Sequence, residues 1–280
     1  MVVIGLFTSP GVLNEPDYVN KKLFHWIHSS GATCKTIDYN TEALNNQLDK
    51  VDGLVMGGGA VESKNHTKEQ REKLFQTYAA AFSYANTLNK MAKISFPIFT
   101  ICLGCEMMML IKNQSPDFKL LDKVEVDGKR KLSFGVDSEL KRAFPTKMLD
   151  SMATTNCVVQ HHFMGVKIGS PLYNSFNEIG LVVLGTDTSP QGVYVNMVKY
   201  VGLPYYGIMW HPEKAWNELS KKVALQLSKF LKLECKCRTH FCLNDSSSML
   251  HVRKTVGRQV SLLRKHSSTR KRSKRRRASS

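Results

Sequence analysis

The order of apolar and amphipathic segments constrains the fold of this 280-residue chain more than any other feature. Short apolar runs, typical of buried strands, alternate with segments that carry apolar residues at helical spacing. The strand-like runs of the first half are residues 2–7, 33–37, 51–56 and 96–101, and the helix-like segments are residues 17–29, 67–90 and 103–111. This β-α-β-α order predicts a parallel sheet covered by helices on both faces.

The second half of the chain predicts more strands and one last helix. Polar and apolar residues alternate across residues 118–136 around Asp127-Gly128, which indicates a hairpin. Further strands are expected at residues 157–163, 179–185, 193–200 and 205–210, and an amphipathic helix at residues 215–233. We therefore expect an α/β fold with a mostly parallel central sheet flanked by helices on both faces.

The basic residues divide the chain into parts. The net charge is +17, but residues 251–280 hold twelve Lys and Arg and no acidic residue, which leaves +5 for residues 1–250. A basic, Ser-rich segment with few large apolar side chains cannot bury enough surface to offset the entropy of ordering it. We predict a folded domain at residues 1–234, a Cys- and Ser-rich linker at residues 235–250 and a basic disordered tail at residues 251–280.

The tail and the N-terminus bear on localisation. A dense basic run at residues 270–277 is typical of a nuclear localisation signal or a polyanion-binding arm, and a solvated extension without function is the third alternative. The N-terminus lacks the charged n-region of a signal peptide, and no apolar run is long enough to span a membrane. We expect an intracellular protein, cytoplasmic or nuclear through the tail, with no membrane partner.

Seven cysteines at irregular spacing do not suggest a disulfide framework, so reduced thiols are expected. Cys235, Cys237, His240 and Cys242 fall within eight residues, but their spacing does not match the usual zinc sites. We expect free thiols there, and neither a metal nor another cofactor.

The strongest local signal is an apolar strand that ends at Cys102, followed by Leu103-Gly104 at the start of a helix. This strand–nucleophile–helix turn lifts a side chain above the carboxyl edge of the sheet. The helix N-terminus favours the thiolate, and the backbone N–H of Leu103 points to where an oxyanion would form. A buried structural cysteine is the alternative interpretation.

A second strand, residues 205–210, runs into His211-Pro212-Glu213. Residues two apart on a strand share one side, so Glu213 can orient His211 while His211 takes the thiol proton. The glycines at residues 57–59 end another strand, and Gly59 or Gly58 could supply the second oxyanion N–H. We predict Cys102 as nucleophile, His211 as general base and Glu213 as the residue that orients it.

These segments resemble those of the gamma-glutamyl hydrolases, which belong to the class I glutamine amidotransferase-like superfamily with its flavodoxin-like fold. The resemblance covers about residues 3–232 and rests on Cys102-Leu103-Gly104-x-Glu106, on residues 210–214 and on residues 53–61. Residues 160–166 resemble the segment that holds the additional active-site histidine of the family. That role would fall on His162, with His161 where relatives often have asparagine.

The resemblance implies an omega-type cysteine peptidase that cleaves γ-glutamyl bonds, such as those of folate polyglutamates, through a thioester intermediate. Glu106 lies one helical turn after Cys102 and would face the site, although a helix-surface or capping carboxylate is an equal alternative. Gly58 and Glu106 are thus candidates for substrate binding. The expected partner is a small-molecule substrate, with a homodimer as one option and an import receptor or polyanion bound through residues 251–280.

The sequence also departs from the family pattern. Thr100 stands two residues before the nucleophile, where relatives often have glycine, and Met56-Gly57 replaces a common apolar-Pro pair. The family is often secreted or lysosomal and enters with a signal peptide, and it does not need a basic tail. Two rival functions stay open: a glutaminase subunit that delivers ammonia to a partner synthetase, and a degenerate binding protein with a nuclear or nucleic-acid-binding tail.

Overall fold

The structure is a computed structural model that describes residues 1–9, 18–41, 43–59, 67–91, 94–135 and 138–242. The predicted tail at residues 251–280, the end of the predicted linker and Ala60-Val61 of the glycine loop lie outside the described residues. The domain boundaries therefore stay a prediction.

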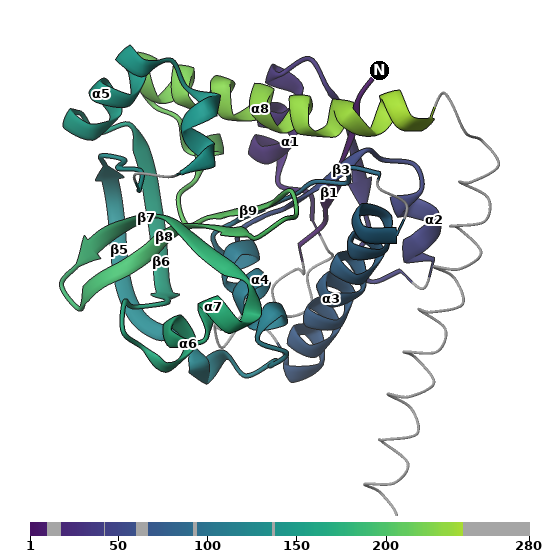
Figure 1. Cartoon of the computed structure of the whole chain (residues 1–280), viewed down its shortest axis with the longest axis horizontal. Coiled ribbons are helices and arrows are strands. Elements are labelled where there is room, and N and C mark those ends of the chain that lie inside the picture. Colours follow the sequence, from purple (N-terminus) through teal and green to yellow (C-terminus); the bar gives the residue numbers. More distant parts are fainter. Residues whose placement is uncertain (10–17, 42, 60–66, 92–93, 136–137, 243–280) are drawn as a thin grey trace, which may run out of the picture.

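A seven-stranded sheet forms the centre of the molecule, in the order β2-β1-β3-β4-β9-β8-β7 (Figure 1). The first five strands in this order are parallel, and β8 and β7 complete the sheet as antiparallel strands. Their bounds are β1 Val3–Phe7, β2 Thr33–Ile37, β3 Gly53–Met56, β4 Ile98–Ile101, β7 Leu181–Ser189, β8 Gly192–Tyr200 and β9 Tyr205–Ile208. The predicted α/β fold with a mostly parallel sheet is confirmed.

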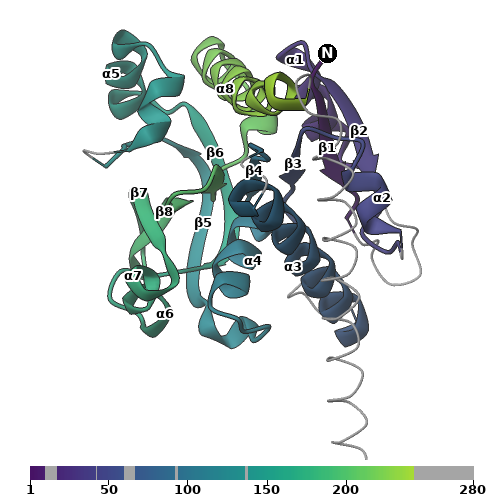
Figure 2. The same cartoon turned by 45° about the vertical axis from the view of Figure 1, so that its right-hand side comes forward.

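Helices cover both faces of this sheet, as Figure 2 shows from a second direction. On one face lie α1 (Lys21–Ser29), α5 (Thr146–Thr154) and α8 (Glu218–Cys242), which pack over one apolar core. On the other face lie α2 (Leu44–Leu48), α3 (Lys68–Met91) and α4 (Leu103–Lys112), which pack over a second core. Burial from both sides explains why the central strands β1, β3 and β4 contain almost no polar residue, whereas the edge strands β2 and β7 do.

Side-chain caps fix the starts of two helices. The Asn20 side chain accepts hydrogen bonds from the backbone N–H groups of Lys22 and Leu23 at the start of α1. Thr67 and Gln70 form reciprocal side-chain–backbone hydrogen bonds of 2.8 and 3.1 Å before α3. This capping box satisfies two backbone donors that the helix itself cannot pair.

The predicted hairpin at Asp127-Gly128 is wrong. Strand β5 (Asp122–Arg130) runs straight through both residues and pairs with β6 (Val158–Gly165) as an antiparallel two-stranded ribbon. Gly128 keeps its place in the strand at a φ of +117°, a conformation that favours glycine. The glycine therefore marks an irregularity within a strand rather than a turn.

Helix α8 is longer than predicted, because it continues to Cys242 instead of ending near residue 233. Cys235 lies in this extension and is completely buried. A Cβ atom added at Gly53 would lie 2.6 Å from its sulfur, so helix and strand approach closely there. The first part of the predicted linker is thus helical and packs on the sheet.

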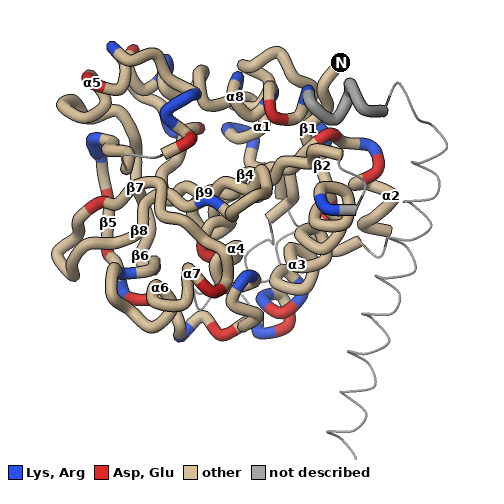
Figure 3. Tube along the Cα trace, viewed as in Figure 1, with Lys and Arg blue, Asp and Glu red and all other residues tan. Residues whose placement is uncertain are grey.

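The short elements are α6 (Pro171–Asn174), α7 (Phe176–Ile179) and the 3-10 turns η1 (Phe118–Leu120), η2 (Glu139–Ala143) and η3 (Pro212–Lys214). Acidic and basic residues are interspersed over the described chain (Figure 3). None of the helices in the described ranges is both long and apolar enough to cross a membrane.

Candidate active site

Cys102 lies at the carboxyl end of β4 in a conformation that side chains rarely adopt. Its φ is +53° and its ψ is −115°, which turns the chain sharply from the strand into α4. Its backbone N–H donates to the Ile208 carbonyl at 2.8 Å, and its own carbonyl accepts from the N–H of Cys105 and of Glu106. Such strain is held by the surrounding structure, and it is typical of functional positions.

Two glycines let the neighbouring chain approach this turn. A Cβ atom added at Gly104 would lie 2.4 Å from the Met56 carbonyl oxygen, so only glycine allows the first turn of α4 to pack against the end of β3. A Cβ atom added at Gly58 would lie 3.2 Å from the Cys102 Cβ and 3.0 Å from the His211 Cε1. The thiol and the imidazole therefore flank the same glycine.

His211 follows β9 and is held from two directions. Its N–H donates to the Val159 carbonyl of β6 at 2.8 Å, and its Nδ1 lies 2.8 Å from Glu213 Oε1. The Glu213 side chain is only 1% exposed. The other ring nitrogen, Nε2, is buried and has no hydrogen-bond partner among the described residues. This nitrogen is the one that would exchange a proton with a thiol.

His162 lies on β6 with both ring nitrogens next to protein acceptors. Its Nδ1 lies 3.1 Å from the Met164 carbonyl oxygen, and its Nε2 lies 3.0 Å from Gln160 Oε1. Burial lowers the pKa of His162 to about 4, the hydrogen bond with Met164 opposes this, and the nearby His211 lowers the pKa further. His162 is thus close enough to His211 for their charges to interact, while its nitrogens are engaged by its own strand.

Gln160 extends this arrangement away from the nucleophile. Its side-chain nitrogen donates to Asp187 Oδ2 at 2.8 Å, and its oxygen accepts from the Tyr194 hydroxyl. Tyr194 and Gln160 are completely buried, and the Tyr194 ring packs against the His162 ring. Sequence reasoning missed this network, because Asp187 and Tyr194 lie on strands whose polar residues looked like ordinary surface positions.

His161 contacts the nucleophile through its backbone. Its carbonyl oxygen lies 3.7 Å from Cys102 Sγ, while its half-exposed imidazole pairs with Asp127 at 3.0 Å. Successive side chains on a strand point to opposite faces, so adjacent histidines must separate. The contact of the His161 backbone with Cys102 depends on how β6 packs beside β4, so the sequence pattern did not reveal it.

Three further residues were predicted for the site, namely Glu106, Leu103 and Gly59, and the structure shows their burial. Glu106 is 2% exposed, so the helix-surface alternative is wrong, and its charge adds to burial in raising the pKa of the Cys105 thiol. Leu103 is buried in the first turn of α4, and Gly59 is exposed after β3. Their roles in oxyanion binding, and that of Glu106 in substrate binding, stay predictions.

Thr100 departs from the family pattern without disturbing the turn. It is completely buried, and its hydroxyl donates to the Tyr206 carbonyl of β9 at 3.1 Å. The same hydroxyl lies 3.8 Å from the sulfur of Met108 on α4. The Thr100 side chain thus joins β4 to β9 and contacts α4.

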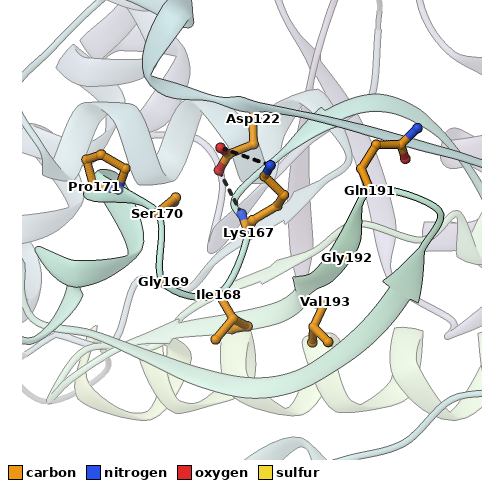
Figure 4. A pocket seen from close by; sticks show the side chains of 9 residues that line it. All are labelled: Asp122, Lys167, Ile168, Gly169, Ser170, Pro171, Gln191, Gly192 and Val193. Atoms are coloured by element: carbon orange, nitrogen blue, oxygen red, sulfur yellow. Dashed lines mark hydrogen bonds and ion pairs between the residues drawn. The ribbon is translucent and has the colours of Figure 1, made fainter.

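A pocket of about 340 Å³ lies elsewhere, between the start of β5, the loop after β6 and the turn from β7 to β8 (Figure 4). Asp122 accepts from the Lys167 N–H at 2.9 Å, and the Lys167 ammonium lies 3.9 Å from the same carboxylate. None of its lining residues belongs to the set around Cys102. Among the described residues no group of three or more His, Cys, Asp or Glu could hold a metal ion.

Comparison with known proteins finds a matching family model and several relatives. The family model described as "Glutamine amidotransferase class-I" matches residues 12–227. Gamma-glutamyl hydrolase B of Dictyostelium discoideum is 24% identical over 89% of this chain and 73% of its own length. Gamma-glutamyl hydrolase 1 of Arabidopsis thaliana is 27% identical over 76% of this chain, which spans 62% of that protein. The human gamma-glutamyl hydrolase is 22% identical over 82% of this chain and 74% of its own length.

A solved structure shows the same fold. It is that of a putative GMP synthase component from Thermoplasma acidophilum, with a TM-score of 0.53 and 16% identity, and the match covers 86% of this chain and 96% of that one. At this identity the likeness concerns the fold alone.

Proposed function

Because the chain belongs to the class-I glutamine amidotransferase family, we propose that it is a cysteine-dependent γ-glutamyl hydrolase. The observation that carries the proposal is the position of Cys102 and His211 on either side of Gly58, with Glu213 paired to the far nitrogen of the imidazole. Relatives named gamma-glutamyl hydrolase in Dictyostelium, Arabidopsis and human support a γ-glutamyl bond as the one that is cleaved. The substrate class is a γ-glutamyl peptide such as folate polyglutamate.

The reaction would proceed through a thioester. The Cys102 sulfur attacks the γ-amide carbonyl carbon while His211 takes the thiol proton, and the N–H groups of Leu103 and Gly59 stabilise the oxyanion. His211 then gives the proton to the leaving amine as the C–N bond breaks. A water molecule, deprotonated by His211, hydrolyses the thioester and restores the thiol. Glu213 keeps the imidazole oriented in each step.

His162 would act through His211 in this scheme. Its lowered pKa keeps the ring neutral, so one of its nitrogens donates to Met164 or to Gln160, and we assign His162 to the environment of His211 rather than to direct proton transfer. The Glu106 carboxylate, buried one helical turn beyond the nucleophile, is proposed to help position the substrate.

The test compares the native chain with Cys102→Ala on folate polyglutamate, with released glutamate or shortened folate measured by chromatography. We expect cleavage by the native chain and none above background by the variant. Glutamine is assayed in parallel, because a glutaminase that serves a synthetase uses the same nucleophile. Saturable glutaminase activity without peptide cleavage would exclude the hydrolase and favour the amidotransferase alternative.

We also propose that residues 251–280 take the protein to the nucleus or bind a polyanion. The support is the sequence alone: twelve basic and no acidic residues in thirty positions. Deleting residues 251–280 should move a fluorescent fusion from nucleus to cytoplasm or abolish heparin retention. Unchanged localisation and retention would contradict this proposal without touching the enzymatic one.

A further inference from the structure

A buried chain of hydrogen bonds leads from Asp187 on β7 to His162 on β6. The Gln160 side-chain nitrogen donates to Asp187 Oδ2 at 2.8 Å, and the Gln160 oxygen lies 3.0 Å from His162 Nε2. The Tyr194 hydroxyl donates to the Gln160 oxygen and lies 3.3 Å from Asp187 Oδ2. Gln160, Tyr194 and His162 are all buried, so water has little access to replace these partners.

The carboxylate of Asp187 fixes the orientation of the Gln160 amide. An ionised carboxylate can only accept hydrogen bonds, and its other oxygen already accepts from the Thr188 N–H at 2.7 Å. Gln160 must therefore turn its nitrogen to Asp187 and its oxygen to His162. Because a hydrogen bond to a charged acceptor is about twice as strong as a neutral one, the reversed amide is strongly disfavoured.

The oriented amide decides where the proton of His162 lies. Both ring nitrogens face acceptors, since Nδ1 lies 3.1 Å from the Met164 carbonyl oxygen and Nε2 faces the Gln160 oxygen. Burial lowers the pKa of His162 to about 4, so near neutral pH the ring has one proton and donates to one acceptor. Linked hydrogen bonds polarise one another, and the chain through Gln160 ends on a carboxylate, which makes the Gln160 oxygen the stronger acceptor.

The same part of β6 also holds the general base. Gln160 pairs with Trp210, the residue before His211, in an antiparallel bridge. The Val159 carbonyl accepts from the His211 N–H at 2.8 Å, and the charge of His211 acts on His162. The dipole of the His162 ring therefore lies beside the imidazole that becomes charged in the proposed reaction, where a dipole of fixed direction affects the rate.

We propose that Asp187 is a positioning residue of the active site, which acts through the Gln160 amide to hold the proton of His162 on Nε2. The effect on catalysis rests on the proposed function, whereas the position of the proton does not. Asp187 contacts neither the thiol nor His211, and no proton moves along the chain during the reaction. Its contribution is a fixed His162 dipole beside His211, and it acts on kcat rather than on KM.

Nitrogen NMR of the full chain with labelled histidine tests the position of the proton near neutral pH. The signals distinguish protonated from unprotonated ring nitrogens, and His162→Gln identifies those of His162 by their loss. We expect a protonated Nε2 in the native chain and in Asp187→Glu, which keeps the carboxylate. In Asp187→Asn the Gln160 amide can turn over and donate to Nε2, so the proton should move to Nδ1 and pair with Met164.

Three further variants sharpen this test. Gln160→Met removes the amide and should also move the proton to Nδ1, which decides the matter if Asp187→Asn does not fold. Tyr194→Phe removes a hydroxyl from the same chain but keeps the Asp187–Gln160 bond, so Nε2 should stay protonated. Asp52→Asn is the distant control, because Asp52 is another half-buried aspartate that accepts a backbone N–H, that of Val3 at 2.8 Å. A native chain with its proton on Nδ1, or one that stays on Nε2 in Asp187→Asn or Gln160→Met, would overturn the proposal.

Kinetics on a γ-glutamyl peptide test the effect on the reaction. Asp187→Asn should lower kcat about tenfold and leave KM unchanged, as expected for one lost hydrogen bond to a charged group, and Asp187→Glu should restore kcat. An unchanged kcat, or an equal loss in Asp52→Asn, would overturn the role of Asp187 in catalysis. If the native chain cleaves no γ-glutamyl peptide, the proposed function fails, while the NMR result still decides where Asp187 places the proton.

Discussion

The Nδ1 atom of His211 lies 2.8 Å from the Oε1 atom of Glu213, a carboxylate whose side chain is almost fully buried two residues later in the chain. Pro212 lies between them and begins the short η3 turn, so the backbone that joins base and carboxylate is restricted. The second carboxylate oxygen is buried without a hydrogen-bond partner among the described residues. The imidazole is therefore the principal partner of this buried carboxylate. The pair favours the tautomer that carries its proton on Nδ1, so the unprotonated Nε2 can accept the proton of the thiol.

Replacing Glu213 by Gln should lower kcat by about 10²-fold or more, because the amide no longer holds His211 in one tautomer. KM should change little, since the carboxylate does not face the substrate in the proposed mechanism. Steady-state kinetics on a γ-glutamyl peptide measure both. A kcat within about twofold of the native value would show that His211 needs no orientation by Glu213.

Two substitutions at Cys102 test its backbone strain separately from its role as the nucleophile. Cys102→Ala and Cys102→Gly should both abolish hydrolysis, but the glycine variant should unfold with a free energy about 1 kcal/mol higher than the alanine variant. The reason is the φ of +53° at this position, which costs about that much for any residue with a Cβ atom. Urea unfolding followed by circular dichroism compares the two. Equal stability, or a more stable alanine variant, would contradict the claim of stored strain.

Gly58→Ala should slow the reaction without unfolding the protein. The added Cβ atom would lie 3.0 Å from His211 Cε1 and 3.2 Å from Cys102 Cβ, closer than ordinary van der Waals contact, so it would push the thiol and the ring apart. A displacement of this kind can lower kcat by about 10²-fold. Gly165→Ala is the control, because a Cβ atom there would meet only ordinary contacts of 3.5 Å with Val124. Similar activities of the two variants would argue against direct apposition of thiol and imidazole.

His162 should make stability depend on pH. Burial lowers its pKa to about 4 in the folded state, against about 6.5 in an unfolded chain. Between these values the unfolded chain binds the extra proton, so the free energy of unfolding is at its full value above about pH 6.5 and decreases as the pH falls toward about 4. The loss would be on the order of 3 kcal/mol for this side chain.

This pH dependence is measured by urea unfolding between about pH 4 and 7.5. His162→Gln should flatten the dependence, whereas His25→Gln, at an exposed position on α1, should not. An unchanged slope in His162→Gln would mean that other groups carry the acid sensitivity.

Local signals predicted the parts of the site that depend on neighbouring residues in the chain. The apolar run before Cys102, the glycine after it and the His-Pro-Glu segment each specify one turn, and the turns lie where the pattern placed them. The parallel sheet then brings them together, because β4 and β9 are hydrogen-bonded neighbours. The fold and the grouping of Cys102, His211 and Glu213 were therefore accessible from sequence, while their catalytic roles stay predictions.

What escaped prediction depends on partners far away in the chain. Asp127-Gly128 has the composition of a turn, yet pairing with His161 and Gln160 keeps it within β5. The surroundings of the two adjacent histidines also depend on the partners of β6. The His161 side chain is half-exposed to solvent, and the His162 ring packs against the Tyr194 ring. Helix α8 continues because Cys235 finds space against Gly53, which no local pattern reveals.

The hydrogen bond from the Thr100 hydroxyl, which joins β4 to β9, has a consequence for how the substrates of this enzyme could change in evolution. Cys102 and His211 are fixed to adjacent strands by this bond and by the N–H of Cys102 on Ile208, although a long stretch of sequence separates them. The intervening chain adds β8 and β7 to the same sheet and builds the β5–β6 ribbon, which reaches His211 through the Val159 carbonyl and Cys102 through the His161 carbonyl. Both contacts use backbone carbonyls, so the side chains of the ribbon can be exchanged for new substrates while the reacting pair is inherited intact.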